Sequence, residues 1–234
     1  MREAVILAGG LGTRLQPVVK DLPKAMAPVN GRPFLEYLLD YLRSFGIARV
    51  VLSVGHRSKM IETHFGSEYN GIEISYAVEK QPLGTGGGLR LAFEKCKNEY
   101  VLALNGDTLF QIDLKGFEIK YTKSDAVAAI ALREVQDVSR FGAVKIDKNH
   151  RITHFGEKTS EPVSGLINGG IYLLNRSFFL AQTVAGAFSV ERDFFERLYP
   201  QGLIAGFVFD AWCIDIGIPE DYLRAQHEFK RFVN

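Results

Sequence analysis

Near its start the chain reads Leu7-Ala8-Gly9-Gly10-Leu11-Gly12-Thr13-Arg14-Leu15, directly after the apolar residues 4–6. Three glycines in a turn after a predicted strand, residues 5–8, allow backbone N–H groups to converge on phosphate oxygens without interference from Cβ atoms. Arg14 adds a guanidinium whose forked donors suit a polyphosphate. The stretch therefore predicts a phosphate-binding loop, although the glycines alone are equally typical of an ordinary turn between a strand and a helix.

Beyond this loop, apolar runs of strand length alternate with amphipathic runs of helix length. Residues 33–45 carry apolar side chains at helical spacing, with Pro33 in the first turn and Gly46 as a stop signal. Alternation predicts a β-α-β-α-β-α-β order, and hence a Rossmann-like three-layer α/β/α fold with a mixed, mostly parallel sheet. The remaining strands are expected at residues 49–54, 72–78 and 100–104, and the remaining helices at residues 58–65 and 87–96.

The second half of the chain is less regular but contains no linker, repeat or low-complexity run. It is predicted to extend the same sheet, with antiparallel strands, rather than to form a separate domain. We therefore expect a single domain over residues 1–234. Strands are predicted at residues 126–132, 142–146, 166–174 and 203–209, a helix is expected to end at residues 194–199, and a terminal helix is predicted at residues 219–232.

Composition excludes several classes of protein. Apolar residues make up 47% of the chain and the formal net charge is +1, which gives no support to a nucleic-acid footprint. The two cysteines, Cys96 and Cys213, are far apart and form no paired motif, so neither a disulfide framework nor a Cys-based zinc site is expected. No run approaches the roughly 20 apolar residues of a membrane helix. We expect a cytoplasmic protein without a membrane partner.

Lys24 stands ten residues after Arg14, within Pro23-Lys24-Ala25-Met26-Ala27-Pro28. The flanking prolines stiffen this loop and fix the approach of the lysine. A solvated surface lysine is the alternative interpretation. Two better-known phosphate loops do not fit, because the dinucleotide fingerprint lacks its third small residue at Leu15 and no P-loop string occurs.

Together, G-G-x-G-T-R-L and P-K-x-M resemble the signature of the sugar-phosphate nucleotidyltransferases. The resemblance implies a GT-A-like nucleotidyltransferase fold and an enzyme that joins an NTP and a sugar 1-phosphate, releasing pyrophosphate. It also implies a nucleotide-binding half at residues 1–110 and a sugar-phosphate-binding half at residues 111–234. In the first loop, the nucleotide-binding residues that it implies are Leu7, Ala8, Gly9, Gly10, Gly12 and Thr13, with Arg14 and Lys24 as catalytic cations.

By the same resemblance, residues 79–88 form the nucleobase loop, in which glycine backbone lies against a base. The implied contacts are Glu79, Pro82, Gly84 and Thr85. Guanine presents N1–H and N2–H₂ side by side, which two carboxylate oxygens can match, whereas uracil and thymine present one ring N–H. Glu79 therefore favours GTP weakly, and an exposed, solvated glutamate is an equal alternative.

Asn105-Gly106-Asp107-Thr108 follows the fourth predicted strand, at the edge where open α/β sheets bind ligands. Magnesium commonly takes one or two protein carboxylates together with phosphate oxygens. The resemblance implies Mg²⁺ on Asp107 and Asp215, with Gly106 contacting the nucleotide. For either aspartate alone, a turn or capping role is the alternative.

Phe155-Gly156-Glu157-Lys158 and Asn168-Gly169-Gly170-Ile171-Tyr172 resemble the sugar-binding strings of the family. They imply that Glu157 binds sugar hydroxyls, that Lys158 binds the sugar phosphate and that Asn168 shapes the pocket. Gly142 resembles a glycine that passes close to the sugar. Residues 137–144, 166–170 and 209–222 resemble the D-glycero-α-D-manno-heptose 1-phosphate guanylyltransferases.

This resemblance implies direct in-line attack of the sugar phosphate on the α-phosphorus of GTP, forming GDP-D-glycero-α-D-manno-heptose for a surface polysaccharide. Alternatives within the class are a mannose-1-phosphate guanylyltransferase and an amino-sugar-1-phosphate uridylyltransferase. Outside it, a binding subunit without activity would lack the charged residues that are present here. A nicotinamide dehydrogenase would need the missing third glycine. The sequence leaves a homo-oligomer open.

Overall fold

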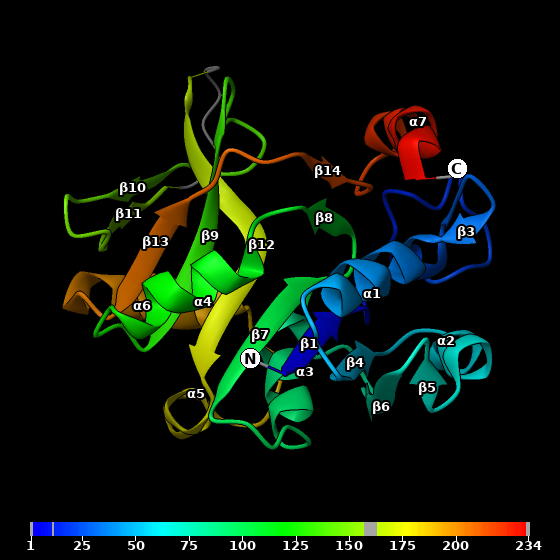
Figure 1. Ribbon diagram of the computed structural model, residues 1–234, viewed down its shortest axis with the longest axis horizontal. Helices are drawn as coiled ribbons and strands as arrows, with labels where there is room; N and C mark the ends of the chain where they lie inside the picture. Colours follow the sequence, from blue (N-terminus) through cyan, green and yellow to red (C-terminus); the bar gives the residue numbers. More distant parts are fainter. Residues whose placement is uncertain (1, 11, 157–162, 233–234) are drawn as a thin grey trace.

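The computed structural model describes residues 2–10, 12–156 and 163–232. Within these residues a single twisted sheet of ten strands runs through the molecule (Figure 1). Its main path has the order β11-β10-β12-β7-β1-β4-β6-β5, and β9 and β13 continue from β12. The strands are β1 Glu3–Leu7, β4 Arg49–Val54, β5 Glu68–Tyr69, β6 Ile72–Val78, β7 Tyr100–Asn105, β9 Ala128–Val135, β10 Val144–Ile146, β11 Ile152–Phe155, β12 Gly165–Asn175 and β13 Ile204–Val208.

The first half of the chain supplies the parallel part of the sheet. β1 lies between β4 and β7, and β4 continues to β6, all in parallel. Leu7 at the end of β1 pairs in register with Ser53 of β4 and with Asn105 of β7. The loops after β1, β4 and β7 therefore leave the sheet on the same side, at the carboxyl ends of these strands, which we call the ligand edge. Ligands of open parallel sheets bind there.

The second half extends this sheet with antiparallel strands, as the sequence predicted. β12 runs antiparallel to β7 and to β9, and β13 then pairs with β9 in parallel. The register of β12 against β9 shifts between Asn168 and Tyr172. The predicted mixed, mostly parallel sheet with helical layers is thus confirmed.

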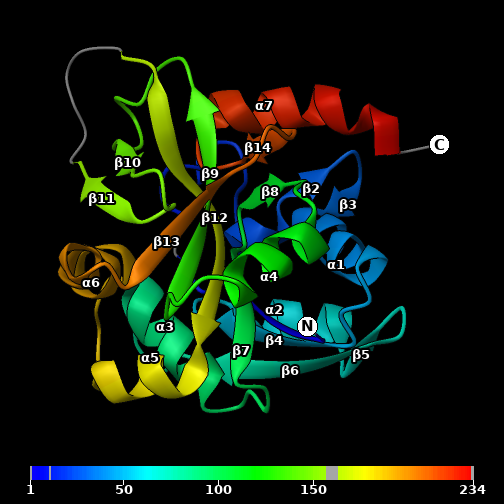
Figure 2. The same ribbon diagram turned by 60° about the vertical axis from the view of Figure 1, so that its left-hand side comes forward.

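Helices cover both faces of the sheet (Figure 2). Successive side chains of β1 alternate between the faces: Ile6 packs in a core cluster with α1 and α4, whereas Val5 packs in a second cluster with α3 and α5. The helices are α1 Phe34–Ser44, α2 Ser58–Phe65, α3 Gly84–Phe93, α4 Leu114–Thr122, α5 Arg176–Gln182, α6 Glu196–Leu198 and α7 Pro219–Glu228, with a π-helix at Val190–Phe195 and 3₁₀ turns at Lys24–Met26, Tyr199–Gln201 and Phe229–Phe232.

Two short antiparallel pairs lie outside the main sheet. β2 Pro28–Val29 pairs with β3 Arg32–Pro33, just after the Lys24 turn. β8 Thr108–Phe110 pairs with β14 Cys213–Asp215, which places Asp215 opposite Thr108. The second pair carries the segment before α7 back to the end of β7, so residues far apart in the sequence meet at the ligand edge.

Several boundaries differ from the sequence prediction for physical reasons. The predicted helix 87–96 begins instead at Gly84, because Gly86 N–H donates to Phe188 O at 2.9 Å and anchors the first turn. The predicted terminal helix 219–232 continues after Glu228 only as a 3₁₀ turn. Helices α4 and α5 were not predicted. No helix among the described residues is long and apolar enough to cross a membrane.

Candidate functional site

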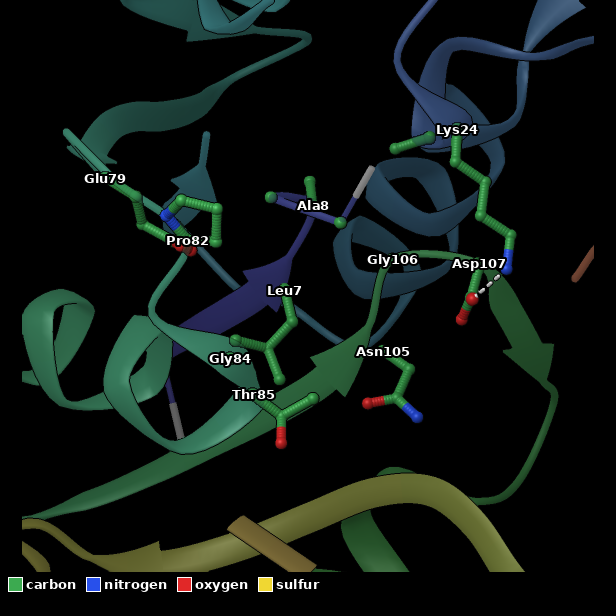
Figure 3. Close-up of a pocket in the computed structure, with 13 residues that line it drawn as sticks. Leu7, Ala8, Lys24, Glu79, Pro82, Gly84, Thr85, Asn105, Gly106 and Asp107 are labelled. Atoms are coloured by element: carbon green, nitrogen blue, oxygen red, sulfur yellow. Dashed lines mark hydrogen bonds and ion pairs between the residues drawn. The ribbon is translucent and has the colours of Figure 1, made fainter. Parts of the chain in front are cut away.

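A cavity of about 300 Å³ opens where β1 and β7 end and α3 begins (Figure 3). Most of its walls come from the residues that the sequence predicted to bind the nucleotide or to act on it. Asn105 and Ala25 join them, and neither was predicted. The lining residues are Leu7, Ala8, Gly9, Gly10, Lys24, Ala25, Glu79, Pro82, Gly84, Thr85, Asn105, Gly106 and Asp107.

Close backbone contact shapes the floor of this first cavity. A Cβ atom on Gly106 would lie 2.5 Å from the carbonyl oxygen of Leu7, which is closer than real Cβ contacts come. The Gly106 N–H donates to that same oxygen at 2.9 Å. Glycine therefore lets the chain after β7 cross over the end of β1.

Lys24 and Asp107 form an ion pair at one end of the first cavity. Lys24 reaches it from the 3₁₀ turn Lys24–Met26, and only 13% of its side chain is exposed. Gly12 backs onto the stem of this lysine, since a Cβ atom there would lie 3.0 Å from the Cβ of Lys24. The glycine loop and the Lys24 turn are thus packed together, so Lys24 is not a solvated surface lysine.

Asp215 joins this end of the site through the pairing of β14 with β8. The Thr108 hydroxyl lies between the two carboxylates, 3.2 Å from Asp107 Oδ1 and 3.5 Å from Asp215 Oδ2. Burial, followed by the negative charge of Asp107, raises the pKa of Asp215 above its ordinary value. Lys24 supplies one positive charge against two carboxylates, which leaves the pair short of cationic charge.

This donor set fits a magnesium ion that also binds substrate. The described part of the chain holds no group of three or more His, Cys, Asp or Glu residues able to enclose a metal alone. Two carboxylates on one small site match the usual Mg²⁺ arrangement, in which phosphate oxygens and water complete the shell. The residues present therefore fit the ion that the sequence implied.

The outer part of the glycine loop, residues 12–14, does not make the cavity contacts that were predicted for it. Arg14 and Thr13 are exposed, and Gly12 is half-buried; none of the three lines the first cavity. Leu15 is buried and anchors the loop, and its N–H donates to Gly12 O at 2.9 Å. Arg14 therefore lies outside the cavity that holds Lys24 and Asp107.

Glu79 is half-buried and engaged with its own surroundings, so it is not the exposed, solvated glutamate of the alternative. Its Oε2 accepts from Leu83 N–H at 2.9 Å, and its Oε1 accepts from the Ser53 hydroxyl at 3.3 Å. A Cβ atom on Gly9 or on Gly88 would lie 2.6 or 2.7 Å from Oε1. Glu79 thus ties the two glycine loops and β4 together while it lines the cavity.

The glycines that follow Thr85 have a packing role that the sequence did not predict. A Cβ atom on Gly86 would lie 2.1 Å from the ring of Phe188, and one on Gly87 would lie 2.2 Å from Gly186 O. These glycines face the 186–188 segment, whereas Gly84 and Thr85 line the cavity. The flat surface expected for a base is therefore limited to the start of α3.

A second cavity of about 380 Å³ lies on the other side of Asn105, between β12, β14 and α7. Asn105 lines both cavities, and Asp107 of the first stands next to Thr108 of the second. The lining residues of the second cavity are Asn105, Thr108, Arg133, Val135, Arg140, Phe141, Ile167, Asn168, Gly169, Gly170, Tyr172, Glu191, Cys213, Asp215, Asp221 and Arg224.

The predicted sugar residues are distributed unevenly around this second cavity. Asn168 lines it. Its Oδ1 accepts a hydrogen bond from Gly170 N–H at 2.9 Å, and its Nδ2 donates one to the Tyr172 hydroxyl at 3.0 Å. Gly142 is buried and does not line the second cavity. Its φ of 87° turns the chain directly after Arg140 and Phe141, and both of these residues line the cavity. Glu157 and Lys158 lie outside the described residues.

Apart from Asp215, the charged residues of the second cavity were not predicted as site residues. Arg140 donates to Asp221 at 2.8 Å, and this ion pair joins the loop before β10 to α7. Arg224 lies 3.3 Å from the same carboxylate. Arg133 extends from β9 and Glu191 from the π-helix. Asp221 and Arg224 share α7, but Arg133, Arg140 and Glu191 come from three other segments, so local spacing in the sequence could not have grouped the set.

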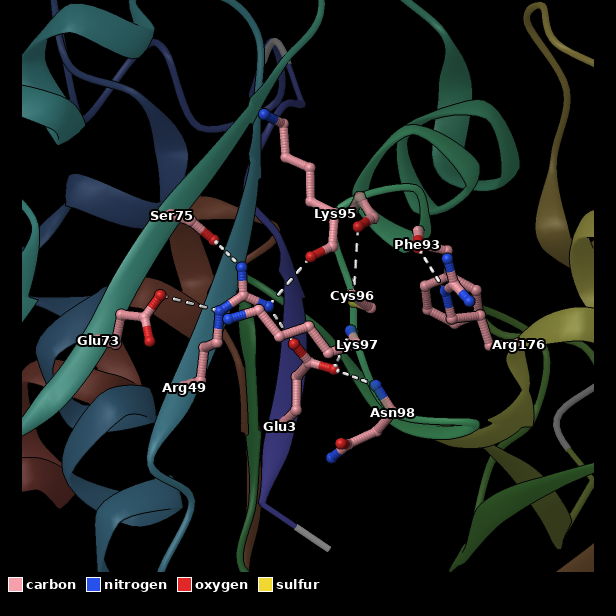
Figure 4. A network of polar contacts seen from close by, with 11 residues as sticks. Glu3, Arg49, Glu73, Ser75, Phe93, Lys95, Cys96, Lys97, Asn98 and Arg176 are labelled. Carbon is pink, nitrogen blue, oxygen red and sulfur yellow. Dashed lines mark hydrogen bonds and ion pairs between the residues drawn. The ribbon is translucent and has the colours of Figure 1, made fainter.

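A polar cluster lies at the amino ends of β1 and β4, and Figure 4 shows its contacts. Glu3, 2% exposed, forms an ion pair with Arg49 and accepts from the N–H groups of Lys97 at 2.8 Å and Asn98 at 2.9 Å. Arg49 also donates to Glu73 at 3.0 Å. These groups satisfy one another, and none of them lines either cavity, so we assign this cluster a structural role.

The fold is that of an α/β protein of the GT-A-like nucleotidyltransferase class. Residues 3–231 match the nucleotidyl transferase family, and the chain belongs to that family. The sequence-based prediction of the family and of its fold is therefore confirmed.

Among its relatives, a D-glycero-alpha-D-manno-heptose 1-phosphate guanylyltransferase from Aneurinibacillus thermoaerophilus is 44% identical over 99% of this chain and 100% of its own length. An enzyme of the same name from Campylobacter jejuni is 42% identical over 94% of this chain and 96% of its own. The crystal structure of HddC from Yersinia pseudotuberculosis has a TM-score of 0.86 at 36% identity, covering 98% of this chain and 100% of that chain. Its complex with GMP-PN superposes with a TM-score of 0.85.

The structural role of Glu3 can be tested by mutation. Glu3→Ala leaves Arg49 without its buried partner and leaves two N–H groups without an acceptor, so we expect it to lower the free energy of unfolding by about 3–5 kcal/mol. Chemical denaturation followed by circular dichroism measures this loss. Glu73→Ala is the matched control, because Glu73 binds the same arginine but is 57% exposed, and it should cost less than about 1 kcal/mol. Equal losses for the two variants would contradict the assignment.

Proposed function

We propose that this chain is a guanylyltransferase that joins GTP and D-glycero-α-D-manno-heptose 1-phosphate into GDP-D-glycero-α-D-manno-heptose and pyrophosphate. One observation carries the proposal: two cavities share Asn105 and meet at the carboxylates of Asp107 and Asp215. A reaction between two phosphate-bearing substrates needs this layout. The names and near full-length similarity of the relatives supply the choice of nucleotide and sugar.

The two halves of the domain divide the substrates between them. Every residue that lines the first cavity precedes residue 110, and all but Asn105 and Thr108 of the second cavity follow it. We assign the nucleotide to the first cavity and the sugar 1-phosphate to the second. This division supports a single domain over residues 1–234 whose halves act together.

The chemistry is an in-line substitution at phosphorus. A phosphate oxygen of the sugar 1-phosphate attacks the α-phosphorus of GTP, and the bond from that phosphorus to the oxygen bridging to the β-phosphate breaks, releasing pyrophosphate. The nucleophile is already an anion, so no general base is needed. Bringing two anions together makes alignment and charge neutralisation the main tasks.

The residues of this chain are assigned to those tasks by position. Lys24, held against Asp107 and mostly buried, stabilises the α-phosphate as charge develops there. Asp107 and Asp215 would hold Mg²⁺, which supplies positive charge to the phosphates when bound. Arg14, on the exposed part of the glycine loop, binds the leaving pyrophosphate where it extends beyond the cavity. Lys158 is assigned to the attacking phosphate and Glu157 to sugar hydroxyls, by family resemblance.

Guanine recognition is assigned to the start of α3 and to Glu79. Because both carboxylate oxygens of Glu79 already accept hydrogen bonds, the residue would hold the base loop in shape and present acceptor lone pairs that remain free. Ala8, Gly9 and Gly10 place backbone groups along the same cavity. We place the enzyme in the cytoplasm, where GTP is available, and its product supplies glycosyl transfer to a surface polysaccharide.

The choice of substrates is tested by a panel. The purified chain is incubated with Mg²⁺, each of GTP, UTP, ATP and dTTP, and heptose, mannose or glucosamine 1-phosphate, and released pyrophosphate is measured. We expect turnover with GTP and the heptose, and at least tenfold lower kcat/KM with UTP. Turnover with UTP and an amino-sugar 1-phosphate but not with GTP would overturn the proposal.

The assigned role of Lys24 predicts a loss of catalysis rather than of folding. Lys24→Met removes the cation but keeps the apolar stem that packs against Gly12, so kcat should fall about 10²–10³-fold. Lys115→Met is the control, since Lys115 is exposed on α4 away from both cavities, and it should leave kcat unchanged. A Lys24→Met enzyme with kcat within threefold of the wild type would contradict the assignment.

A further inference from the structure

Glu191 faces the second cavity from an unusual backbone. It lies in the π-helix Val190–Phe195, a rare conformation that often marks functional positions. One carboxylate oxygen, Oε2, accepts from the Thr85 hydroxyl at 2.7 Å and from the Ser189 hydroxyl at 2.7 Å. That oxygen is therefore fixed from both sides.

The fixing group comes from the wall of the nucleotide cavity. Thr85 lines the first cavity, and its hydroxyl donates to Glu191 while it accepts from Val190 N–H at 3.0 Å. With its single proton committed to Glu191, this hydroxyl has no donor left for a nucleotide. The Phe188 N–H donates to Leu83 O at 3.0 Å, which further ties the segment to the start of α3. Thr85 therefore positions Glu191.

The other carboxylate oxygen is available to a ligand. Glu191 Oε1 receives no hydrogen bond from any residue in the described ranges. Asn105, Asn168 and the Tyr172 hydroxyl lie around the same part of the second cavity. Burial, followed by the negative charge of Glu191, raises the pKa of Tyr172, which places the carboxylate close to that hydroxyl.

The chemistry of this group selects its partner. A carboxylate only accepts hydrogen bonds and repels phosphate, so it needs a neutral donor. Of the two ends of a sugar 1-phosphate, only the hydroxyl-bearing ring offers such donors. The phosphate belongs at the opposite end, near Lys24, where Asp107 and Asp215 would hold the Mg²⁺ that supplies positive charge.

We propose that Glu191 binds the sugar, accepting hydrogen bonds from ring hydroxyls through Oε1, and that Thr85 and Ser189 are positioning residues that set its place. This inference rests on the proposed assignment of the sugar 1-phosphate to the second cavity. It has one consequence across the site: a change at Thr85, inside the nucleotide cavity, weakens binding of the sugar and not of the nucleotide.

The test uses two variants and direct binding. Glu191→Gln retains an oxygen that can accept from Thr85 and Ser189 but turns an NH₂ donor toward the sugar. Thr85→Val keeps the shape of the first cavity and removes the positioning hydroxyl. Glu196→Gln is the matched control, because Glu196 is exposed and lines neither cavity. Calorimetry gives the Kd of each protein for GTP and for D-glycero-α-D-manno-heptose 1-phosphate.

Loss of a hydrogen bond to a charged group predicts a Kd for the sugar 1-phosphate raised about 10- to 100-fold in Glu191→Gln. We expect a smaller rise in Thr85→Val, wild-type values in Glu196→Gln, and a Kd for GTP within twofold in all three. Monodeoxy sugar 1-phosphates add a second readout: removing the contacted hydroxyl should weaken the wild type but not weaken Glu191→Gln further.

Three results would overturn the inference. The first is a sugar Kd within twofold of the wild type in Glu191→Gln. The second is a raised GTP Kd with an unchanged sugar Kd in Thr85→Val, which would make Thr85 a nucleotide ligand. If Glu191→Gln fails to fold, the Kd values of Thr85→Val for the sugar 1-phosphate and for GTP decide by this second criterion. The third is a wild type that binds no sugar 1-phosphate, which removes the proposed function as well; the first two leave that function intact.

Discussion

Parallel pairing of β1 with β4 and β7 is the constraint on which the rest of the site depends. It brings the loops after Leu7 and Asn105 to one edge of the sheet, where Gly106 crosses the end of β1 with no room for a side chain. The first cavity is the space that these loops leave open. Without that register, the glycine loop and Asp107 would have no common surface.

Charged side chains lie at both ends of the sheet's strands and interact differently at each. Lys24 pairs with Asp107, and β14 delivers Asp215 beside them, so one lysine faces two carboxylates at the junction of the cavities. The pair of Glu3 and Arg49 lies at the amino ends of β1 and β4, where Glu3 also accepts from two backbone N–H groups and Arg49 also donates to Glu73. One edge of the sheet is thus closed by internal hydrogen bonds, whereas the other holds charges that suit phosphates and a cation.

Much of this arrangement could be predicted from the sequence, because local signals carried it. The sequence pattern predicted β4, α2 and β6 at their observed bounds. Of the glycine and lysine motifs, Gly9, Gly10 and Lys24 line the first cavity, whereas Arg14 does not. Helices α4 and α5 were missed although Asp113 and Asn175 cap them, since their apolar stripes are short. The second cavity was least predictable: Arg133, Arg140, Glu191 and Arg224 come from four elements that only the tertiary fold brings together. The role of the glycines after Thr85 also depended on a distant partner, Phe188.

In the proposed mechanism, substrate phosphates and a divalent ion meet at Asp107 and Asp215, between the two cavities. Crystals of the protein soaked with Mn²⁺ and a non-hydrolysable GTP analogue, with diffraction measured at the manganese edge, would locate that ion. We expect an anomalous peak within coordinating distance of both carboxylates and of a phosphate oxygen, with the base at the start of α3. An analogue bound in the first cavity with manganese touching neither aspartate would contradict it.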